Sequence, residues 1–332
     1  MPLTEPRSRI LGTGHYLPEI VRTNFDLEKM VDTSDEWIRG RTGIRERRIA
    51  PDNVMTSDMA TEAGKRAIEA AGIQPNQIDM IMVGTVTPDM PMPATAAFVQ
   101  QKLGITSPCP SFDLSAACAG FVFGLSIADQ FVRTGAAKYV LVIGVELLSR
   151  VIDWQERTTC VLFGDGAGAV VVGPASGDGR GILSTKILTD GSLAGSLMIP
   201  GGGSVEPMTP ERIEAKRHKV HMRGQDIFKA AVKNLCSASK NAIEASGLTP
   251  DDVDWLCSHQ ANIRIIDAVV ARLQVPPEKV LVNIERVGNT SSASIPILLD
   301  ENVRSGRIKE GNTVLMCALG AGISWGSALV RM

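Results

Sequence analysis

Cys118 is the residue best suited to nucleophilic chemistry. The residues around it, from Ser115 to Gly120, are small, and an apolar run follows them. The run repeats at spacings typical of one helical face, which consists of Phe121, Leu125, Ala128 and Val132. Cys118 would stand at the N-terminus of this buried helix, where free N–H groups and the helix dipole favour a thiolate. A buried structural cysteine is the alternative, because that is the usual fate of a free thiol.

His259 and Asn289 are the candidates for a second catalytic function. A histidine can exchange a proton or donate a hydrogen bond, whereas an asparagine only donates or accepts. Together with a nucleophilic cysteine, such a pair can hold the oxygen of a developing enolate. The alternatives are a core histidine for His259 and a turn residue for Asn289, since Gly-Asn-Thr is common in turns.

The overall composition excludes several classes of function. The chain has 332 residues and a formal net charge of −2, so nothing indicates a nucleic acid or an acidic membrane surface as a partner. The six cysteines show no metal-type spacing, and we expect neither a metal nor a resident cofactor. The segment 1–6 lacks the apolar core of an export signal, and no run is long enough to span a bilayer. We therefore expect a cytoplasmic protein.

Strands and helices alternate along the chain, which indicates a layered α/β fold. A helix is predicted over 57–71, before Gly72. Continuous apolar strands, typical of a sheet covered on both faces, are predicted over 78–83, 139–145, 161–163 and 169–172. Residues 173–221 are rich in glycine, proline and charge, and we expect them to be connecting segments.

The second half of the chain repeats the first. The segment 67–73 recurs at 242–248, an offset of 242 − 67 = 175, and the segment 132–135 recurs at 303–306, an offset of 303 − 132 = 171. Matches in the same order with a drifting offset indicate a duplicated unit with small insertions. At an offset of 171, Cys118 corresponds to Asn289. We therefore expect a pseudo-twofold axis to bring both residues to the centre, with His259 at a nearby strand end.

Several motifs together resemble those of β-ketoacyl-acyl carrier protein synthase III. They run in order over nearly the whole chain, at 33–38, 41–44, 116–120, 163–169, 259–262, 287–294 and 325–328. The resemblance implies the thiolase fold, in which two duplicated halves, here 1–180 and 181–332, form an αβαβα sandwich. It also implies a homodimer and a catalytic triad of Cys118, His259 and Asn289.

The resemblance implies a two-stage reaction. Cys118 takes the acyl group from an acyl-CoA, which is a substrate and not a cofactor. Malonyl-acyl carrier protein then loses CO₂ while His259 and Asn289 bind its thioester oxygen, and the resulting enolate attacks the acyl-cysteine. The oxyanion of that attack would face the backbone N–H groups of Cys118 and Ala321.

Further residues are assigned to substrates by the same resemblance. Those expected to bind CoA and its pantetheine arm are Thr33, Trp37, Arg41, Arg157, Gly224, Phe228 and Asn262. Those expected to dock the carrier protein are Gln260, Ala261, Ile263, Arg264 and Lys229. Met92, reaching from the neighbouring subunit, would limit the acyl pocket. Without the resemblance, a buried Trp37 and solvated arginines are the simpler interpretation.

The chain departs from the family pattern at Gln225, Ala321 and Met92, and a flexible Met92 would suit a longer or branched starter. Fatty acid initiation is the leading hypothesis. A related condensing enzyme of a secondary-metabolite pathway is the first alternative. A papain-like Cys–His–Asn hydrolase and a catalytically silent carrier-binding module are the others.

Overall fold

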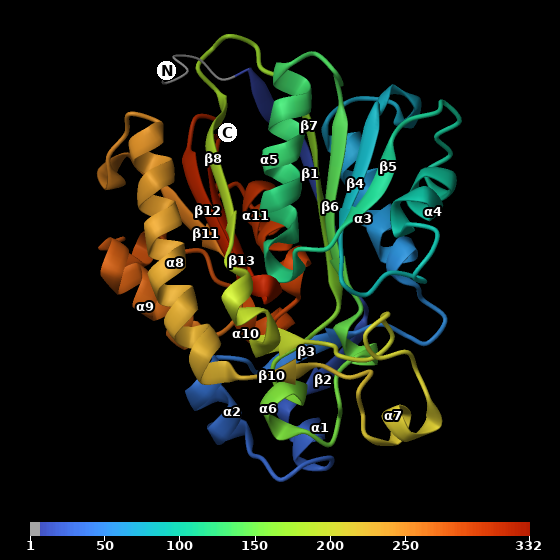
Figure 1. Ribbon diagram of the computed structural model, residues 1–332. Coiled ribbons are helices and arrows are strands. Elements are labelled where there is room, and N and C mark those ends of the chain that lie inside the picture. Colours follow the sequence, from blue (N-terminus) through green and yellow to red (C-terminus); the bar gives the residue numbers. More distant parts are fainter. Residues whose placement is uncertain (1–6) are drawn as a thin grey trace.

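The computed structural model describes residues 7–332, so the segment 1–6 considered above lies outside the described residues. Two large sheets and three layers of helix alternate across the molecule (Figure 1). The expected five-layer αβαβα arrangement is therefore present. None of the helices within residues 7–332 is long and apolar enough to cross a membrane.

The first sheet has five strands in the order β1-β7-β6-β4-β5. The strands are β1 (Ser8–Tyr16), β4 (Met80–Gly84), β5 (Ser111–Leu114), β6 (Val140–Glu146) and β7 (Gly166–Pro174). β4 runs parallel to both β5 and β6, whereas β7 runs antiparallel to β6 and β1. The prediction of a strand over 161–163 is wrong. Those residues follow a short helix, and only Phe163 forms an isolated bridge, to Asn289.

The second sheet has four strands in the order β11-β12-β13-β8. They are β8 (Gly181–Thr189), β11 (Trp255–Ser258), β12 (Thr313–Gly320) and β13 (Ser324–Arg331). β8 lies inside 173–221, the stretch expected to consist of connecting segments. It was missed because its residues are mostly half-buried or exposed, so the sequence lacks a continuous apolar run there.

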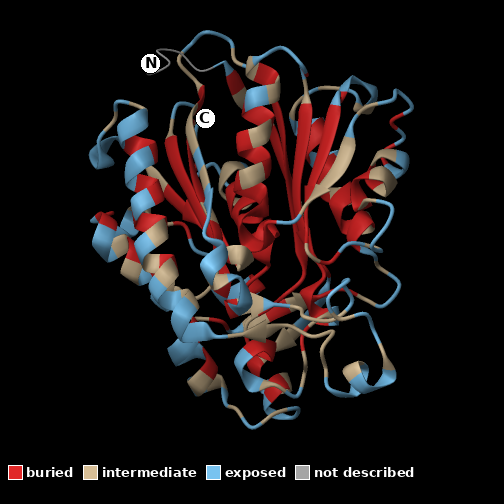
Figure 2. Cartoon of the chain, in the orientation of Figure 1, coloured by how far each residue is buried: buried red, intermediate tan, exposed pale blue. Residues whose placement is uncertain are grey.

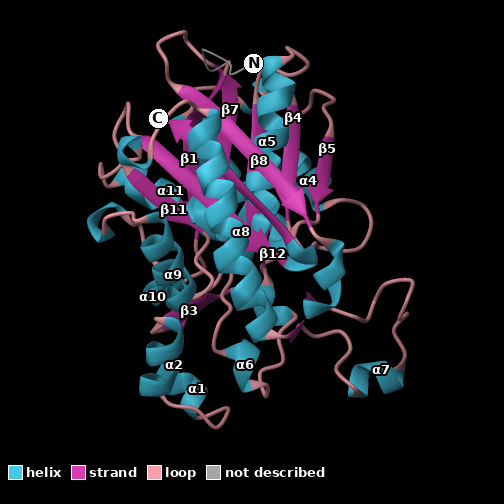
Figure 3. Cartoon of the chain, turned by 60° about the vertical axis from the view of Figure 1, so that its left-hand side comes forward, coloured by secondary structure: helices cyan, strands magenta, loops and turns pink. Residues whose placement is uncertain are grey.

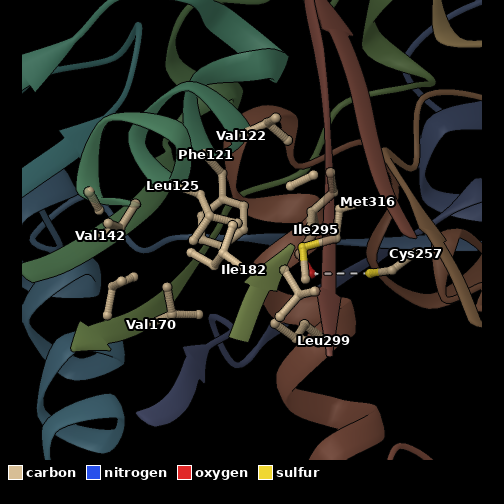
Figure 4. Packing of buried hydrophobic residues seen from close by; sticks show 14 of the residues in the cluster. Phe121, Val122, Leu125, Val142, Val170, Ile182, Cys257, Ile295, Leu299 and Met316 are labelled. Carbon is tan, nitrogen blue, oxygen red and sulfur yellow. Dashed lines mark hydrogen bonds between the residues drawn. The ribbon is translucent and has the colours of Figure 1, made fainter. Parts of the chain in front are cut away.

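The central layer consists of α5 (Gly120–Arg133) and α11 (Ser294–Arg304), which pack between the two sheets. Figure 4 shows Phe121 and Leu125 of α5 meeting Ile182, Ile295 and Leu299 from the second half. The outer faces are covered by α3 (Thr56–Ala70) and α4 (Thr95–Lys102) on one side, and by α8 (Gly224–Ala245) and α9 (Ile263–Leu273) on the other. Figure 3 shows α8 lying across the second sheet.

Short elements gather at one end of the sandwich (Figure 1). They are α1 (Asn24–Glu28), α2 (Asp35–Thr42), α6 (Arg157–Cys160), α7 (Pro210–Glu214), α10 (Ile284–Val287), β2 (Ile20–Thr23), β3 (Glu46–Ile49), β9 (Leu197–Met198) and β10 (His221–Met222). Figure 2 shows that burial is concentrated in the sheets and central helices, while this end is largely exposed or half-buried. The strand ends that carry the candidate residues point toward it.

Candidate active site

Cys118 lies in a tight turn, Ala117–Ala119, between β5 and α5, and only 7% of the residue is exposed. Ala117 has a φ of +46°, a left-handed conformation that costs energy for a residue with a Cβ. The end of β12 lies directly against this turn. A Cβ added to Gly320 would stand 2.6 Å from the Cys118 nitrogen, so only glycine allows this approach.

The counterpart of Cys118 in the second half is Ser292, and the predicted equivalence with Asn289 is wrong. Ala117 and Ser291 share a left-handed φ, and each opens a three-residue turn before a central helix, at an offset of 291 − 117 = 174. The shorter offset of 171 holds only at the far ends of the helices, because α11 is 11 residues long and α5 is 14. The two turns nevertheless meet at the centre of the molecule.

The Cys118 sulfur is protonated in the free protein, contrary to the thiolate expected from the helix terminus. The pKa of the thiol is raised to about 12, mainly by burial and also by the nearby Glu146 carboxylate. Hydrogen bonds from Ser291 and from the backbone of Cys118 lower the pKa, but by less than burial raises it. The nucleophile therefore has to lose a proton when it attacks.

His259 directly follows β11 and is held as a neutral imidazole. Its backbone N–H donates to the Cys317 carbonyl at 2.8 Å, and its Nδ1 lies 2.6 Å from Ser294 Oγ. Burial lowers the pKa of the ring to about 3. His259 can therefore offer a hydrogen bond to a substrate oxygen without carrying a charge.

Asn289 is fixed by its neighbours on three sides. Its N–H donates to the Leu162 carbonyl at 2.8 Å, and its own carbonyl accepts from Gly164 at 3.0 Å. Its Oδ1 accepts from the Ser291 backbone N–H at 2.9 Å. Because the amide oxygen is engaged in this way, the side-chain NH₂ group is the donor left for a substrate.

Cys118, His259 and Asn289 line one inner cavity of about 140 Å³. This cavity shares four lining residues with an outer groove of about 630 Å³: Met222, Gly224, Phe228 and Asn262. On its other side, Cys118 borders an apolar pocket of about 200 Å³ that includes Val86, Leu148 and Val220. The sulfur thus lies where a passage from the surface meets a pocket suited to an aliphatic group.

Comparison with known proteins identifies the family of this chain. Two family models match, 3-oxoacyl-[acyl-carrier-protein] synthase III over residues 112–191 and its C-terminal region over 243–332. A β-ketoacyl-[acyl-carrier-protein] synthase III of Caldanaerobacter subterraneus is 53% identical over 97% of both chains. The chain belongs to the β-ketoacyl-acyl carrier protein synthase III family.

Solved structures extend the match to the whole fold. The 3-oxoacyl-[acyl-carrier-protein] synthase III of Aquifex aeolicus is 46% identical, with a TM-score of 0.90 over 98% of this chain and 100% of that one. The priming β-ketosynthase of the R1128 polyketide pathway is 39% identical, with a TM-score of 0.90 over 98% and 97% of the chains. The expected thiolase fold and the expected class, a condensing acyltransferase that initiates fatty acid synthesis, are confirmed. The papain-like hydrolase is excluded.

The residues that family resemblance assigns to the nucleotide end of CoA lie together. The guanidinium groups of Arg41 and Arg157 each stand 4.8 Å from the centre of the Trp37 ring. Thr33 is half-buried and its Oγ1 has no hydrogen-bond partner among residues 7–332, but it lines none of the three cavities. Gly224, Phe228 and Asn262 lie further in, at the boundary between the groove and the inner cavity.

The predicted docking surface of the synthase needs correction. Gln260 is fully buried, its Nε2 donates to the Ser258 carbonyl, and its Oε1 accepts from the backbone of Asn283, so it cannot touch a carrier protein. Two further residues of that set face inward. Ile263 packs against Gly43 beside α2, and Ala261 lines the inner cavity.

Arg264 and Lys229 remain on the predicted docking surface, because both are exposed and both line the outer groove. Met92 is 83% exposed and lines none of the three cavities in the single chain. A role for Met92 in the acyl pocket would therefore act on a second copy of the synthase.

Sequence reasoning missed three polar residues around the site: Glu146, Ser291 and Ser294. Glu146 gave a usable signal, since it is an acidic residue at the end of an otherwise apolar strand, and such a residue is rarely buried without a purpose. The two serines gave none, because serine is common before helices. Within residues 7–332, no group of three or more metal-ligating side chains is present.

Proposed function

We propose that Cys118, His259 and Asn289 carry out the condensation by which the family starts fatty acid synthesis. In the first stage, the Cys118 sulfur attacks an acyl-CoA thioester and CoA leaves as a thiolate. The oxyanion of this step faces the backbone N–H groups of Cys118 and Ala321, which both border the apolar pocket. The acyl chain then occupies that pocket.

In the second stage, the thioester of malonyl-acyl carrier protein enters the inner cavity. Its carbonyl oxygen accepts hydrogen bonds from His259 and from the Asn289 NH₂ group. Loss of CO₂ places the negative charge on this oxygen, where two donors stabilise it. The enolate carbon attacks the acyl group, and Cys118 leaves as a thiolate.

The main support for this function is that the three side chains line one cavity, and that this cavity opens onto a cationic groove. Arg41, Lys229 and Arg264 line that groove, and none takes part in an ion pair within residues 7–332. Free cations beside a narrow channel suit the phosphates of CoA and of a carrier-bound pantetheine arm. Acyl-CoA and malonyl-acyl carrier protein are the substrates this supports.

A homodimer is supported by the free edge of the first sheet. Within residues 7–332, β5 ends that sheet and pairs only with β4, and its four residues are half-buried. An edge strand of this kind is a template for pairing with a second copy. The exposed Met90 and Met92 lie in the loop before α4, which packs on β5, so a partner there would cover them.

The halves 1–180 and 181–332 are proposed as the two copies of one ancestral unit. The strands of the five-stranded sheet lie before residue 175 and those of the four-stranded sheet after 180. A cytoplasmic location is supported by six free cysteines, five of them buried, as expected in a reducing compartment.

The alternative is a condensing enzyme that primes a secondary-metabolite pathway. The 39% identity to the R1128 priming ketosynthase supports it, although less strongly than the 53% identity to the Caldanaerobacter synthase supports fatty acid initiation. Turnover with acetyl-CoA and malonyl-acyl carrier protein separates the two functions. Efficient use of acetyl-CoA supports fatty acid initiation, whereas strict dependence on another starter supports the alternative.

The direct test is intact-mass analysis after incubation with a panel of acyl-CoAs. We expect one acyl adduct per chain, lost on addition of malonyl-acyl carrier protein as a β-ketoacyl product forms. Cys118→Ser should carry no adduct. Undiminished labelling of Cys118→Ser would remove Cys118 as the nucleophile.

A further inference from the structure

Glu146 is a fully buried carboxyl group that the condensation described above does not use. It is the last residue of β6, at the junction of the two halves. Its Oε2 accepts from the Thr87 hydroxyl at 2.7 Å, the Val86 N–H at 3.1 Å and the Thr85 hydroxyl at 3.3 Å. Its Oε1 accepts from the Ser291 hydroxyl at 3.1 Å.

Ser291 connects Glu146 to the nucleophile. Its hydroxyl donates to Glu146 Oε1 at 3.1 Å, and hydrogen bonding from Ser291 lowers the pKa of the Cys118 thiol. Ser291 and Cys118 also border the same apolar pocket. A hydroxyl has one hydrogen and two lone pairs, so Ser291 can accept from one neighbour while it donates to the other. That is the arrangement a proton relay requires.

In the part of the chain that the structure describes, Glu146 has no compensating cation. Among residues 7–332 it takes part in no ion pair. The strongest influences on its pKa are burial and the hydrogen bonds from Thr87, Val86, Ser291 and Thr85. The titratable group that faces it is the Cys118 thiol, whose pKa the Glu146 charge raises. A negative charge on either group therefore makes ionisation of the other less favourable.

The pKa of Glu146 lies closer to neutral pH than the pKa of His259 does. Burial raises the pKa of Glu146 to about 7, whereas burial lowers the pKa of His259 to about 3. A general base is most effective when its pKa is near the working pH. The imidazole is too weak a base for this task, and the structure leaves it free to bind the thioester oxygen.

We propose that Glu146 acts through Ser291 to take the proton of the Cys118 thiol during acylation. This inference rests on the proposed function of Cys118. As the sulfur bonds to the thioester carbon, its proton passes to Ser291 Oγ, and the Ser291 proton passes to Glu146 Oε1. The C–S bond to CoA then breaks, and the CoA thiolate takes a proton from water. Glu146 touches no reacting atom, so it is a positioning residue that also stores the proton.

Condensation completes the cycle. The enolate carbon bonds to the acyl carbon, and the bond to Cys118 breaks with its electrons staying on sulfur. Ser291 donates its proton to this thiolate and takes the proton stored on Glu146. Cys118 returns to a thiol and Glu146 to a carboxylate. Each turnover therefore consumes one proton from water, the one that protonates CoA.

The test is the pH dependence of acylation, followed by intact mass from pH 5.5 to 8.5 in single turnover. In the unaltered protein the rate should rise with pH and level off above about 7. Glu146→Gln keeps the size of the side chain but cannot take the proton. The acylation rate of this variant should be roughly 100-fold lower at pH 8, and its pH profile should lack the inflection near neutrality.

Asp165→Asn is the matched control. Asp165 is equally buried and accepts from Ser149 and from the Ala50 N–H, away from Cys118, so its variant should keep the inflection. If Glu146→Gln does not fold, Ser291→Ala breaks the relay, whereas Thr85→Val removes a hydrogen bond to Glu146 that is not part of the relay. The first should lose the inflection and the second should keep it.

Two failures are distinguishable. An unchanged inflection and a rate within threefold of the unaltered protein, in Glu146→Gln or Ser291→Ala, would overturn the relay while leaving the acyl-cysteine intact. Absence of any adduct on the unaltered protein, at any pH and with any acyl-CoA, would instead overturn the proposed function.

Discussion

His259 Nδ1 lies 2.6 Å from the hydroxyl oxygen of Ser294, the first residue of α11. The same hydroxyl lies 2.9 Å from the Ser291 carbonyl. Its single hydrogen can therefore point to the ring or to the carbonyl. When it points to Nδ1, the imidazole proton resides on Nε2, and this is the tautomer that can donate to a thioester oxygen.

Ser294→Ala should impair condensation more than acylation, because it removes the hydrogen-bond partner that holds the His259 ring at Nδ1. We expect decarboxylation of malonyl-acyl carrier protein to slow about tenfold, equivalent to about 1.4 kcal/mol. Single-turnover acylation should stay within twofold. Ser294→Thr keeps the hydroxyl and should retain most of the rate, and equal losses in both variants would contradict this role.

Asn289→Asp should abolish one of the two donors to the enolate. The aspartate has the same shape but offers a carboxylate, which repels the developing negative charge. Loss of one such donor costs about 2.7–4 kcal/mol, or roughly 100- to 1,000-fold in decarboxylation rate. Acylation by acyl-CoA serves as the internal control, and a parallel loss of acylation would indicate a structural defect instead.

Arg264→Glu should weaken binding of the carrier protein. Arg264 is exposed at the start of α9, beside the groove. Reversal of an exposed charge at the rim of an interface should raise KM for malonyl-acyl carrier protein roughly fivefold, about 1 kcal/mol. Arg272→Glu, in the last turn of the same helix, is the matched control. Equal effects of the two variants would refute a local docking role.

Gly320→Ala should displace the nucleophile. The added Cβ would meet the Cys118 backbone nitrogen at 2.6 Å, and neither backbone can yield without moving the Cys118 turn. We expect unfolding free energy to fall by about 1–3 kcal/mol and acylation to slow by about 100-fold. Gly203→Ala is the control, since a Cβ there meets nothing within 4 Å. Normal acylation by Gly320→Ala would contradict the close approach.

Glu146 should make the folded protein less stable as pH rises. Its pKa is about 7 when folded and near 4.5 when unfolded, so the folded state binds more protons between these values. The unfolding free energy therefore falls across this window, by about 3 kcal/mol from this group. The Glu146→Gln variant has no titrating group at this position, so its unfolding free energy should lack this contribution.

Denaturant unfolding of both proteins at pH 4.5 and pH 8 measures this effect. The stability of Glu146→Gln relative to the unaltered protein should rise by about 3 kcal/mol between the two conditions. Other groups, including His259, titrate in both proteins and cancel in the difference. A pH-independent difference would show that the pKa of Glu146 is not raised.

The fold class and the approach of Cys118 to His259 and Asn289 could be predicted from the sequence. Apolar strands that alternate with helices indicate a sheet covered on both faces, and repeated segments indicate two copies of one unit. Both patterns can be read from the sequence because they depend only on local periodicity and on the order of segments along the chain. Arg264 and Lys229 are exposed, as docking residues must be, and their role in docking stays a prediction.

The tertiary structure alone decided the rest. Gln260 is next to His259 in the chain, yet it is buried by the loop that contains Asn283, which no local pattern reveals. The equivalence of Cys118 with Ser292 appeared only from backbone geometry, because the length difference between the central helices hides it. The charge states of Cys118, His259 and Glu146 depend on burial by segments far apart in sequence, and desolvation is a property of the packed interior rather than of any short stretch of chain.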